Sequence, residues 1–237
     1  MNTIYIYHHL GMGDHILCNG LVRHYAEKYD RIYLFIKPMY FSNVAFMYRD
    51  CSKIKLISMD DNDIRLFMEF NSKNNYLIVG HTKEWFNKLD NAEFETFDVG
   101  FYESQNLPIS YKWDKFYFER DINSELNAYH SMGLSPNEKY IFVHDDEKRN
   151  RIFKPELFNS LKAIKPINFT NIGIFDFIYT IEHAEEVHVM NSSFVCLIDT
   201  MQIKHDKLFY HNYARTDMQN ELGKINPKFK LNWKFLE

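Results

Sequence analysis

The chain has 237 residues, of which 46% are hydrophobic and 25% are charged, a balance typical of soluble globular proteins. The formal charge of −4 argues against a general nucleic-acid binder, which needs a basic face. Three scattered cysteines, without a C-x-x-C pair, predict neither a disulfide framework nor a zinc site. We expect a cytoplasmic protein, because the chain shows no signal-peptide pattern and no apolar run of membrane-spanning length; contact with a membrane surface stays open.

The first half of the chain alternates short apolar runs with segments of helical periodicity. The apolar and aromatic runs predict strands at residues 4–7, 31–36, 53–57 and 76–79. The helical spacing predicts helices at residues 14–29, 40–48 and 61–70. We expect the last of these helices to direct Ile64, Phe67, Met68 and Phe70 inward. This alternation is typical of a parallel sheet with helices on both faces.

The pattern weakens between Trp85 and Asp121 and then restarts. We expect one or two helices after Trp85, and a linker at residues 108–119 that crosses between two halves. Further strands are predicted at 139–143, 186–190 and 208–211, and further helices at 121–132, 174–184, 191–201 and 217–222. The basic, aromatic tail at 226–237 is expected either to return to the first half or to be free. The fold class is therefore α/β, with two Rossmann-like halves that have parallel sheets, residues 1–120 and 121–237.

A glycine turn, Gly11-Met12-Gly13-Asp14, joins the first strand to the first long helix. Asp14 is a favoured residue type for capping the helix start. It is equally well placed to face a ligand at the carboxyl end of the strand, where α/β sheets bind ligands. The turn lacks the third glycine of a dinucleotide-binding fingerprint.

This turn and its flanking strand and helix resemble the amino-terminal loop of bacterial heptosyltransferases and related GT-B glycosyltransferases. The resemblance covers about the first thirty residues. It implies that Asp14 is the base that takes a proton from the acceptor hydroxyl, with Gly11 and Gly13 in the substrate-binding turn. Histidines end several strands (His8, His9, His81 and His144). Without an H-E-x-x-H motif we expect hydrogen-bonding roles for them, with His9 or His8 contacting acceptor or phosphate.

A charged loop follows the strand at 139–143 and contains the tightest basic cluster of the chain. The paired donors of Arg149 or Arg151 match phosphate oxygens, which makes these residues candidates for binding a pyrophosphate. The competing interpretation is a solvated loop with ion pairs to the neighbouring acids. His144 followed by Arg149 loosely resembles the nucleotide-binding stretch of α-1,2-fucosyltransferases, from which the intervening acids are a departure.

Asn191-Ser192-Ser193 lies between the strand at 186–190 and a following helix. Hydroxyls and free amides at a helix start can bind an anion, although Asn and Ser are also common helix caps. The stretch resembles the donor-binding region of GT-B glycosyltransferases, including the fucosyltransferase group. The resemblance implies that Asn191, Ser192 and Ser193 hold the diphosphate of a nucleotide sugar, and it leaves open whether Glu182 or Asp199 meets the ribose.

The sequence and these resemblances together predict a metal-independent glycosyltransferase that works by inversion and needs no cofactor. Its partners would be a nucleotide sugar and a saccharide acceptor, either a glycan or a lipid-linked saccharide, and not a nucleic acid. A nucleotide-sugar epimerase or hydrolase of the same fold remains an alternative. So does a non-catalytic, degenerate member of the fold that serves as an interaction protein. The oligomeric state is not predicted.

Overall fold

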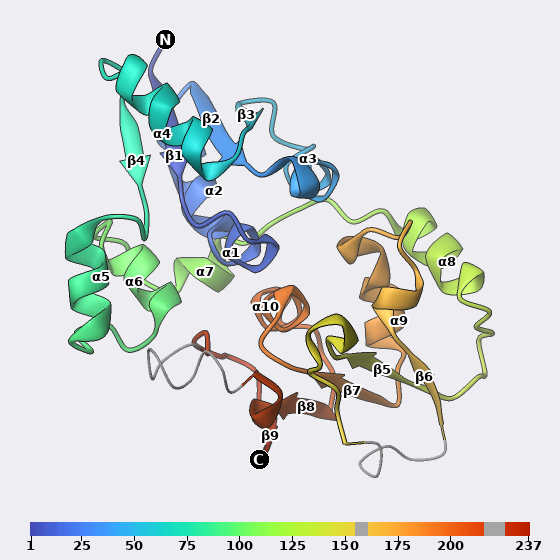
Figure 1. Ribbon diagram of the computed structural model, residues 1–237. Helices are drawn as coiled ribbons and strands as arrows, with labels where there is room; N and C mark the ends of the chain where they lie inside the picture. Colours follow the sequence, from blue (N-terminus) through green and yellow to red (C-terminus); the bar gives the residue numbers. More distant parts are fainter. Residues whose placement is uncertain (155–160, 216–225) are drawn as a thin grey trace. The chain divides into compact units, whose positions relative to one another are not determined.

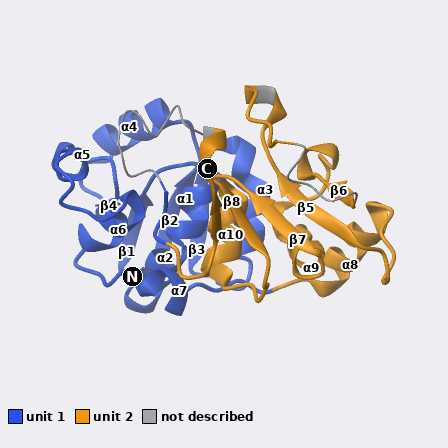
Figure 2. Ribbon diagram, turned by 90° about the horizontal axis from the view of Figure 1, so that it is seen from below, with its two compact units in different colours: residues 1–119, 224–228 blue, residues 120–223, 229–237 orange. Residues whose placement is uncertain are grey.

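The computed structural model describes residues 1–154, 161–215 and 226–237. The chain forms two compact units, which are coloured separately in Figure 2. Unit 1 comprises Met1–Glu119 and Lys224–Lys228, and unit 2 comprises Arg120–Gly223 and Phe229–Glu237. The division therefore falls one residue before the expected boundary and also assigns a short piece of the tail to unit 1.

Unit 1 is built on a four-stranded parallel sheet in the order β3-β2-β1-β4 (Figure 1). The strands are β1 Thr3–Tyr7, β2 Arg31–Ile36, β3 Ile54–Ser58 and β4 Tyr76–Ile78. The helices are α1 Met12–Leu17, α2 Asn19–Lys28, α3 Phe41–Met47, α4 Asp61–Phe70, α5 Lys83–Asp90, α6 Phe97–Glu103 and α7 Tyr111–Asp114. All four predicted strands are confirmed within a residue or two at their ends.

The predicted long first helix is wrong in one respect, because it is interrupted at Cys18, where α1 ends and α2 begins. The hydroxyl of the buried Tyr102 donates a hydrogen bond to the Leu17 carbonyl, 2.7 Å away, and accepts one from the backbone of Leu21. A side chain that inserts between residues i and i−4 in this way breaks the regular hydrogen bonding of a helix.

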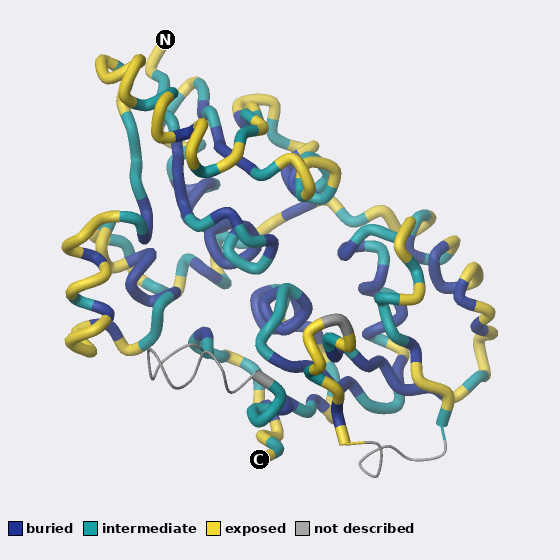
Figure 3. Tube along the Cα trace, in the orientation of Figure 1, coloured by how far each residue is buried: buried dark blue, intermediate teal, exposed yellow. Residues whose placement is uncertain are grey.

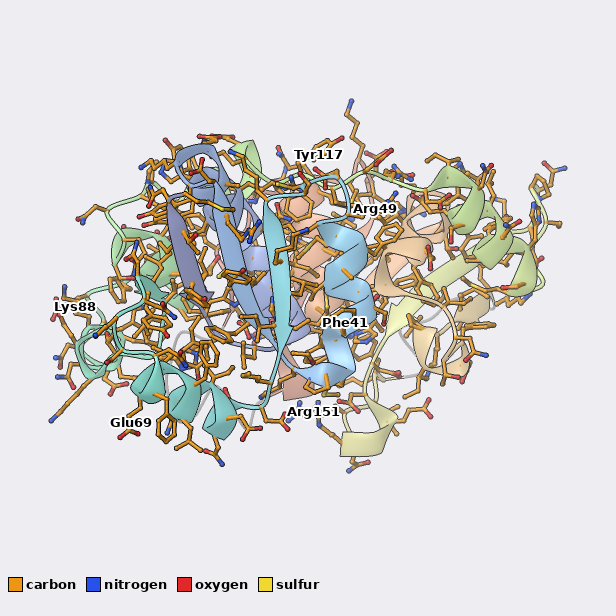
Figure 4. The ribbon with its side chains drawn as sticks, turned by 90° about the horizontal axis from the view of Figure 1, so that it is seen from above. Phe41, Arg49, Glu69, Lys88, Tyr117 and Arg151 are labelled. Carbon is orange, nitrogen blue, oxygen red and sulfur yellow. The ribbon has the colours of Figure 1, made fainter. Side chains whose placement is uncertain are left out.

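Two further expectations for unit 1 need correction. Phe70 is 84% exposed instead of facing inward, whereas Ile64 is fully buried as predicted. The supposed linker at 108–119 is part of the unit: it contains α7, and the side-chain amide of Asn19 bonds both the N–H and the carbonyl of Tyr117 at 3.0 and 3.1 Å. Figure 4 labels the exposed Phe41 on α3 and Glu69 on α4, and the half-buried Lys88 on α5.

Unit 2 has a five-stranded parallel sheet in the order β6-β5-β7-β8-β9. The strands are β5 Tyr140–His144, β6 Lys162–Ile164, β7 Glu186–Val189, β8 Leu208–His211 and β9 Lys234–Leu236. The helices are α8 Ile122–Ser131, α9 Ile178–Glu182 and α10 Ser193–Met201, with short 3-10 turns η2 Glu147–Arg149, η5 Ile174–Phe177 and η6 Asn212–Arg215. The sequence pattern missed β6 and β9, and the helix expected at 217–222 lies outside the described residues.

The apolar core of each unit is made by its sheet and the helices that cover it. The central strands β1, β2, β5, β7 and β8 are mostly buried, which Figure 3 shows in dark blue. Fully buried examples are Ile6 and Leu34 in unit 1 and Ile141 and Val187 in unit 2. Among the described residues no helix is both long and apolar enough to cross a membrane.

The C-terminal tail is held in both units by buried carboxylates. In unit 1 the carboxylate of Asp98 accepts hydrogen bonds from the Lys228 N–H at 3.0 and 3.2 Å. In unit 2 the carboxylate of Asp199 accepts from the N–H groups of Lys230 and Leu231 at 2.9 and 3.0 Å. The described part of the tail is therefore not free, and only residues 226–228 of it belong to unit 1.

Candidate active site

The strand order places a topological switch point in each sheet. From β1 the chain proceeds to β2 and β3 on one side and then returns to β4 on the other. From β5 it proceeds to β6 on one side and then to β7 on the other. Open α/β sheets bind ligands outside the carboxyl ends of the strands at such points. We therefore expect ligand-binding residues at the carboxyl ends of β1 and β4, and at those of β5 and β7 (Figure 1).

The first switch point carries His9, Gly11, Gly13 and Asp14, as the sequence predicts. The N-cap of α1 is Gly11, so the alternative that Asp14 caps this helix is wrong; Asp14 lies in the first turn. Its carboxylate folds back over the glycine, because a Cβ atom on Gly11 would lie 2.7 Å from Asp14 Oδ2. Gly11 has an ordinary φ of −73°, so it provides space for the carboxylate and not an unusual backbone conformation.

Histidines satisfy carbonyl groups that lie beyond the last pairs of this sheet. His9 Nε2 lies 2.7 Å from the Gly80 carbonyl oxygen, and His8 Nδ1 lies 2.5 Å from that of His9. Since a carbonyl oxygen can only accept, both ring nitrogens carry the proton and donate. Burial lowers the pKa of His8 and of His81 to about 4, so these imidazoles are neutral at physiological pH. His8 and His9 thus cap the ends of strands by donating to backbone carbonyl groups.

The second switch point brings together His144, Asn191, Ser192 and Ser193. His144 ends β5 and pairs in register with Val189, the last residue of β7, and its ring lies 4.6 Å from that of Phe194 on α10. Burial lowers the pKa of His144 to about 4. Ser192 is the N-cap of α10, yet its side chain makes no capping bond. Its buried hydroxyl oxygen has no hydrogen-bond partner among the described residues.

Arg149 and Arg151 lie on the loop that follows β5, and Arg151 is labelled in Figure 4. The guanidinium of Arg149 is 68% exposed and lies 2.9 Å from the Asp146 carboxylate within the same loop. The backbones of Asp146 and Arg151 exchange hydrogen bonds of 2.9 and 3.0 Å, which closes the loop. This geometry is that of the solvated ion-paired loop, and the role of either arginine in phosphate binding stays a prediction.

Asp145, which follows His144, was not predicted from the sequence as a site residue. Its side chain is 1% exposed, and one carboxylate oxygen lies 2.8 Å from the ammonium of Lys165. The other oxygen is buried and has no hydrogen-bond partner among the described residues. A carboxylate in this position would accept a hydrogen bond from a hydroxyl or an amino group but would repel a phosphate.

The two acids considered for ribose binding have other partners. Both oxygens of Glu182 bind the guanidinium of Arg120, at 2.8 and 2.9 Å, and Arg120 also bonds Glu125. Asp199 holds the tail, as described above. Within the described ranges no three histidine, cysteine or acidic side chains are grouped as they would be to hold a metal ion.

Two solved structures are similar to the chain along most of its length. One is the glycosyl transferase family 9 structure from Veillonella parvula, with 10% sequence identity and a TM-score of 0.52 over 96% of this chain and 90% of that one. The likeness establishes the fold. It is a GT-B-type fold, with two Rossmann-like units that each have a parallel sheet.

The second similar structure is the E. coli ADP-heptose LPS heptosyltransferase II, with 9% identity and a TM-score of 0.49 over 89% of this chain and 84% of that one. No protein-family model and no curated protein matches the chain. At 10% identity the likeness to the Veillonella parvula structure extends to the fold and not to individual site residues.

Proposed function

We propose that the protein is a glycosyltransferase that moves a sugar from a nucleotide-sugar donor to a hydroxyl of a saccharide acceptor. The reaction would be metal-independent and would invert the sugar carbon by direct displacement. The GT-B-type fold supports this class of reaction, because the similar structure from Veillonella parvula is a glycosyl transferase. Fold alone does not fix function, so the proposal depends on the residues at the two switch points.

The proposal is supported mainly by the Ser192 hydroxyl at the start of α10. A helix start has amide groups without intrahelical partners and a partial positive charge, and both favour an anion. Here the N-cap Ser192 makes no capping bond, and its hydroxyl is buried without a partner among the described residues. Because buried polar groups in proteins are rarely left unpaired, a diphosphate oxygen is a suitable partner for this hydroxyl. Asn191 and Ser193 flank it at the carboxyl edge of the sheet.

In unit 1 the proposed base is Asp14. The bare Cα of Gly11 lets the carboxylate lie over the turn at the carboxyl end of β1. A carboxylate there would take the proton of the acceptor hydroxyl as the oxygen attacks the sugar carbon, while the nucleoside diphosphate leaves with the bonding electron pair. General-base catalysis of this kind contributes a factor of about 10² to 10⁴.

Binding and transfer can be tested separately. We expect at least one of ADP, GDP, UDP and dTDP to raise the melting temperature of the wild type, because a ligand that binds only the native state stabilises it. Ser192→Ala should weaken binding of that nucleotide at least several-fold, whereas Ser131→Ala, a serine of α8 in the same unit, should not. Asp14→Asn should retain nucleotide binding and lose about 10² or more of the transfer rate.

Each result discriminates among the alternatives. Turnover of the nucleotide sugar without any acceptor would identify an epimerase or a hydrolase. Failure of every nucleotide to bind would favour a non-catalytic interaction protein and refute the transferase. Full transfer by Asp14→Asn would remove Asp14 as the base, and a requirement for a divalent cation after chelation would refute the metal-independent mechanism.

A further inference from the structure

A chain of hydrogen bonds runs along the sheet of unit 2 from Glu186 to Lys154. Glu186 Oε2 lies 3.3 Å from His188 Nε2, and His188 Nδ1 lies 2.9 Å from His211 Nε2. His211 Nδ1 lies 2.9 Å from the Tyr213 hydroxyl, which also bonds the Lys154 backbone nitrogen at 3.1 Å. Glu186 begins β7 and His211 ends β8, so the chain leads from the amino end of one strand to the carboxyl end of its neighbour.

The Glu186 carboxylate at one end of this chain imposes the proton order, and the Lys154 amide at the other end is compatible with it. The Lys154 amide can only donate, so the Tyr213 oxygen accepts from it, and the hydroxyl can donate its proton to His211 Nδ1. A neutral His211 then carries its proton on Nε2 and donates to His188 Nδ1. His188 in turn carries its proton on Nε2, directed at the carboxylate of Glu186. Every donor therefore points from Lys154 toward Glu186.

Both histidines are held neutral. His188 is 2% exposed and His211 is fully buried. Burial lowers the pKa of both rings, that of His211 to about 3, and the nearby charge of Lys154 lowers the pKa of His211 further. The Glu186 carboxylate partly offsets this by raising the pKa of His188. Glu186 Oε1 also lies 3.4 Å from the Lys207 ammonium.

Stacked aromatic rings fix the chain in place beside the candidate anion site. The Phe153 ring stacks on His211 with centroids 3.7 Å apart and planes 3° apart, and Phe209 stacks on His188 at 4.6 Å. Phe153 also belongs to a buried apolar cluster with Met190, the residue directly before Asn191. The segment that contains Phe153 and Lys154 therefore shares a buried cluster with the residue that leads into the turn at α10.

The exposed ammonium of Lys154 ends this arrangement and lies 3.5 Å from the carbonyl oxygen of Glu237. The ammonium also lies 4.5 Å from the centre of the Tyr213 ring, a cation–π distance, while the Lys154 backbone is bound by the same tyrosine's hydroxyl. Tyr213 thus holds both the backbone and the side chain of Lys154. A lysine that is oriented in this way loses less freedom when it meets a phosphate, which it binds as a point charge.

We propose that Glu186, His188 and His211 position Tyr213, that Tyr213 positions Lys154, and that Lys154 supplies a cation to the diphosphate of a nucleotide bound at the carboxyl edge of this sheet. The inference rests on the proposed function for the identity of its ligand. Glu186, His188, His211 and Tyr213 are positioning residues, and Lys154 is the ligand contact.

The positioning part is tested by nitrogen-15 NMR of the histidine rings in the full-length protein without ligand. Both His188 and His211 should carry the proton on Nε2; His211 should not titrate between pH 5 and 8, and His188 should titrate below the usual 6.5. In Tyr213→Phe the ring stays to stack with the lysine, but the donor to His211 Nδ1 is lost, so the His211 signals should change. A proton on Nδ1 of either histidine, titration near pH 6.5, or unchanged His211 signals in Tyr213→Phe would overturn the positioning chain.

The ligand part is tested by calorimetric titration with whichever of ADP, GDP, UDP and dTDP binds the wild type. Lys154→Met should weaken binding about tenfold, the loss typical of one charge-assisted contact, and should reduce the salt dependence of binding. Tyr213→Phe should weaken it less, about threefold. The matched control is Tyr129→Phe, which removes a tyrosine hydroxyl that bonds the Ser135 carbonyl at 2.7 Å elsewhere in unit 2, and which should leave binding unchanged.

The outcomes separate this inference from the proposed function. Unchanged affinity in Lys154→Met, in a protein in which Ser192→Ala weakens binding, would overturn the role of Lys154 and leave the transferase standing. Equal losses in Tyr213→Phe and Tyr129→Phe would reduce Tyr213 to a structural residue. If the wild type binds none of these nucleotides, the proposed function fails and the role of Lys154 with it, while the NMR result still decides the positioning chain.

Discussion

The ammonium of Lys112 and the carboxylate of Asp98 lie 2.9 Å apart, and both side chains are fully buried inside unit 1. The backbone of Lys228 completes the pair: its N–H donates to both Asp98 oxygens, and its carbonyl accepts from the Lys112 ammonium at 2.5 Å. Thr96 donates a further hydrogen bond to the carboxylate at 2.6 Å. Two charges that are removed from water in this way are stable only because each has several partners.

Asp98→Asn should therefore destabilise the protein by about 3 to 5 kcal/mol, because it leaves the Lys112 charge buried without its counter-charge. Urea unfolding measures the loss. Asp98→Asn combined with Lys112→Met should recover part of it, since the uncompensated charge is then gone. Glu84→Gln, which breaks the surface pair of Glu84 with Lys88, is the control and should change stability little. A loss no larger than that of the control would show that the buried pair contributes little.

Gly11→Ala should impair transfer without unfolding the protein. The backbone of Gly11 suits alanine, but the new Cβ would lie 2.7 Å from Asp14 Oδ2 and would push the carboxylate from its place over the turn. We expect a loss in kcat that approaches the loss in Asp14→Asn. Combined with Asp14→Asn, the glycine variant should add little, because both changes act on the same carboxylate. Additive losses would mean that Gly11 acts independently of Asp14.

Gly20→Ala should destabilise the protein although the position lies inside a helix. Alanine in a helix interior is normally favoured over glycine by about 1 kcal/mol. Here the added Cβ would lie 2.0 Å from the carbonyl oxygen of Tyr111, which is backbone and cannot turn aside. We expect a net loss of about 1 to 3 kcal/mol, the usual cost of overpacking, measured by urea unfolding. A gain in stability would show that α7 can shift away from α2.

Acid should destabilise the protein between pH 6.5 and about pH 4. Burial lowers the pKa values of His8, His81 and His144 to about 4 and that of His211 to about 3, against 6.5 for an exposed histidine. Between these values the unfolded chain binds more protons than the native protein, so stability is full above pH 6.5 and declines as the pH falls. Each unit of pKa shift corresponds to about 1.4 kcal/mol. The free energy of unfolding, measured with urea between pH 4 and 8, should therefore fall as the pH is lowered below 6.5.

A variant at one buried histidine checks the source of this slope. His144→Gln should lower the number of protons taken up on unfolding at pH 5, and Ser131→Ala, which removes no titratable group, should leave that number unchanged. A slope that is the same in both variants and in the wild type would assign the acid sensitivity to other groups.

Local sequence patterns were sufficient to predict the helices and strands whose apolar spacing lies within the element itself. The run at 31–36 and the helix at 61–70 have the predicted bounds because their apolar spacing is strong and continuous. The break at Cys18 was not predictable in this way, since it depends on Tyr102, which lies 85 residues from Leu17 along the chain. The edge strands Lys162–Ile164 and Lys234–Leu236 were missed because each has only three residues and mostly exposed side chains.

The candidate site was predictable to a similar extent. Glycine, serine and histidine residues at strand ends indicated the two turns, because parallel strands share a carboxyl edge. The sequence could not show that β5 and β7 are neighbours, which is what brings His144 beside Val189 and the ring of Phe194. Nor could it show the proton order from Lys154 to Glu186, because that order depends on contacts between residues far apart in the chain.

The return of residues 226–228 to unit 1 has a consequence for anyone who divides this protein. Neither unit is one continuous stretch of polypeptide, so a gene fragment ending at Glu119 would encode a first unit that lacks the backbone groups bound by Asp98 and Lys112. A chimera that exchanges unit 1 of this protein would have to carry residues 226–228 with it, although residues 229–237 belong to unit 2. The protein thus has two structural units, but each unit is encoded by two separate segments of the sequence.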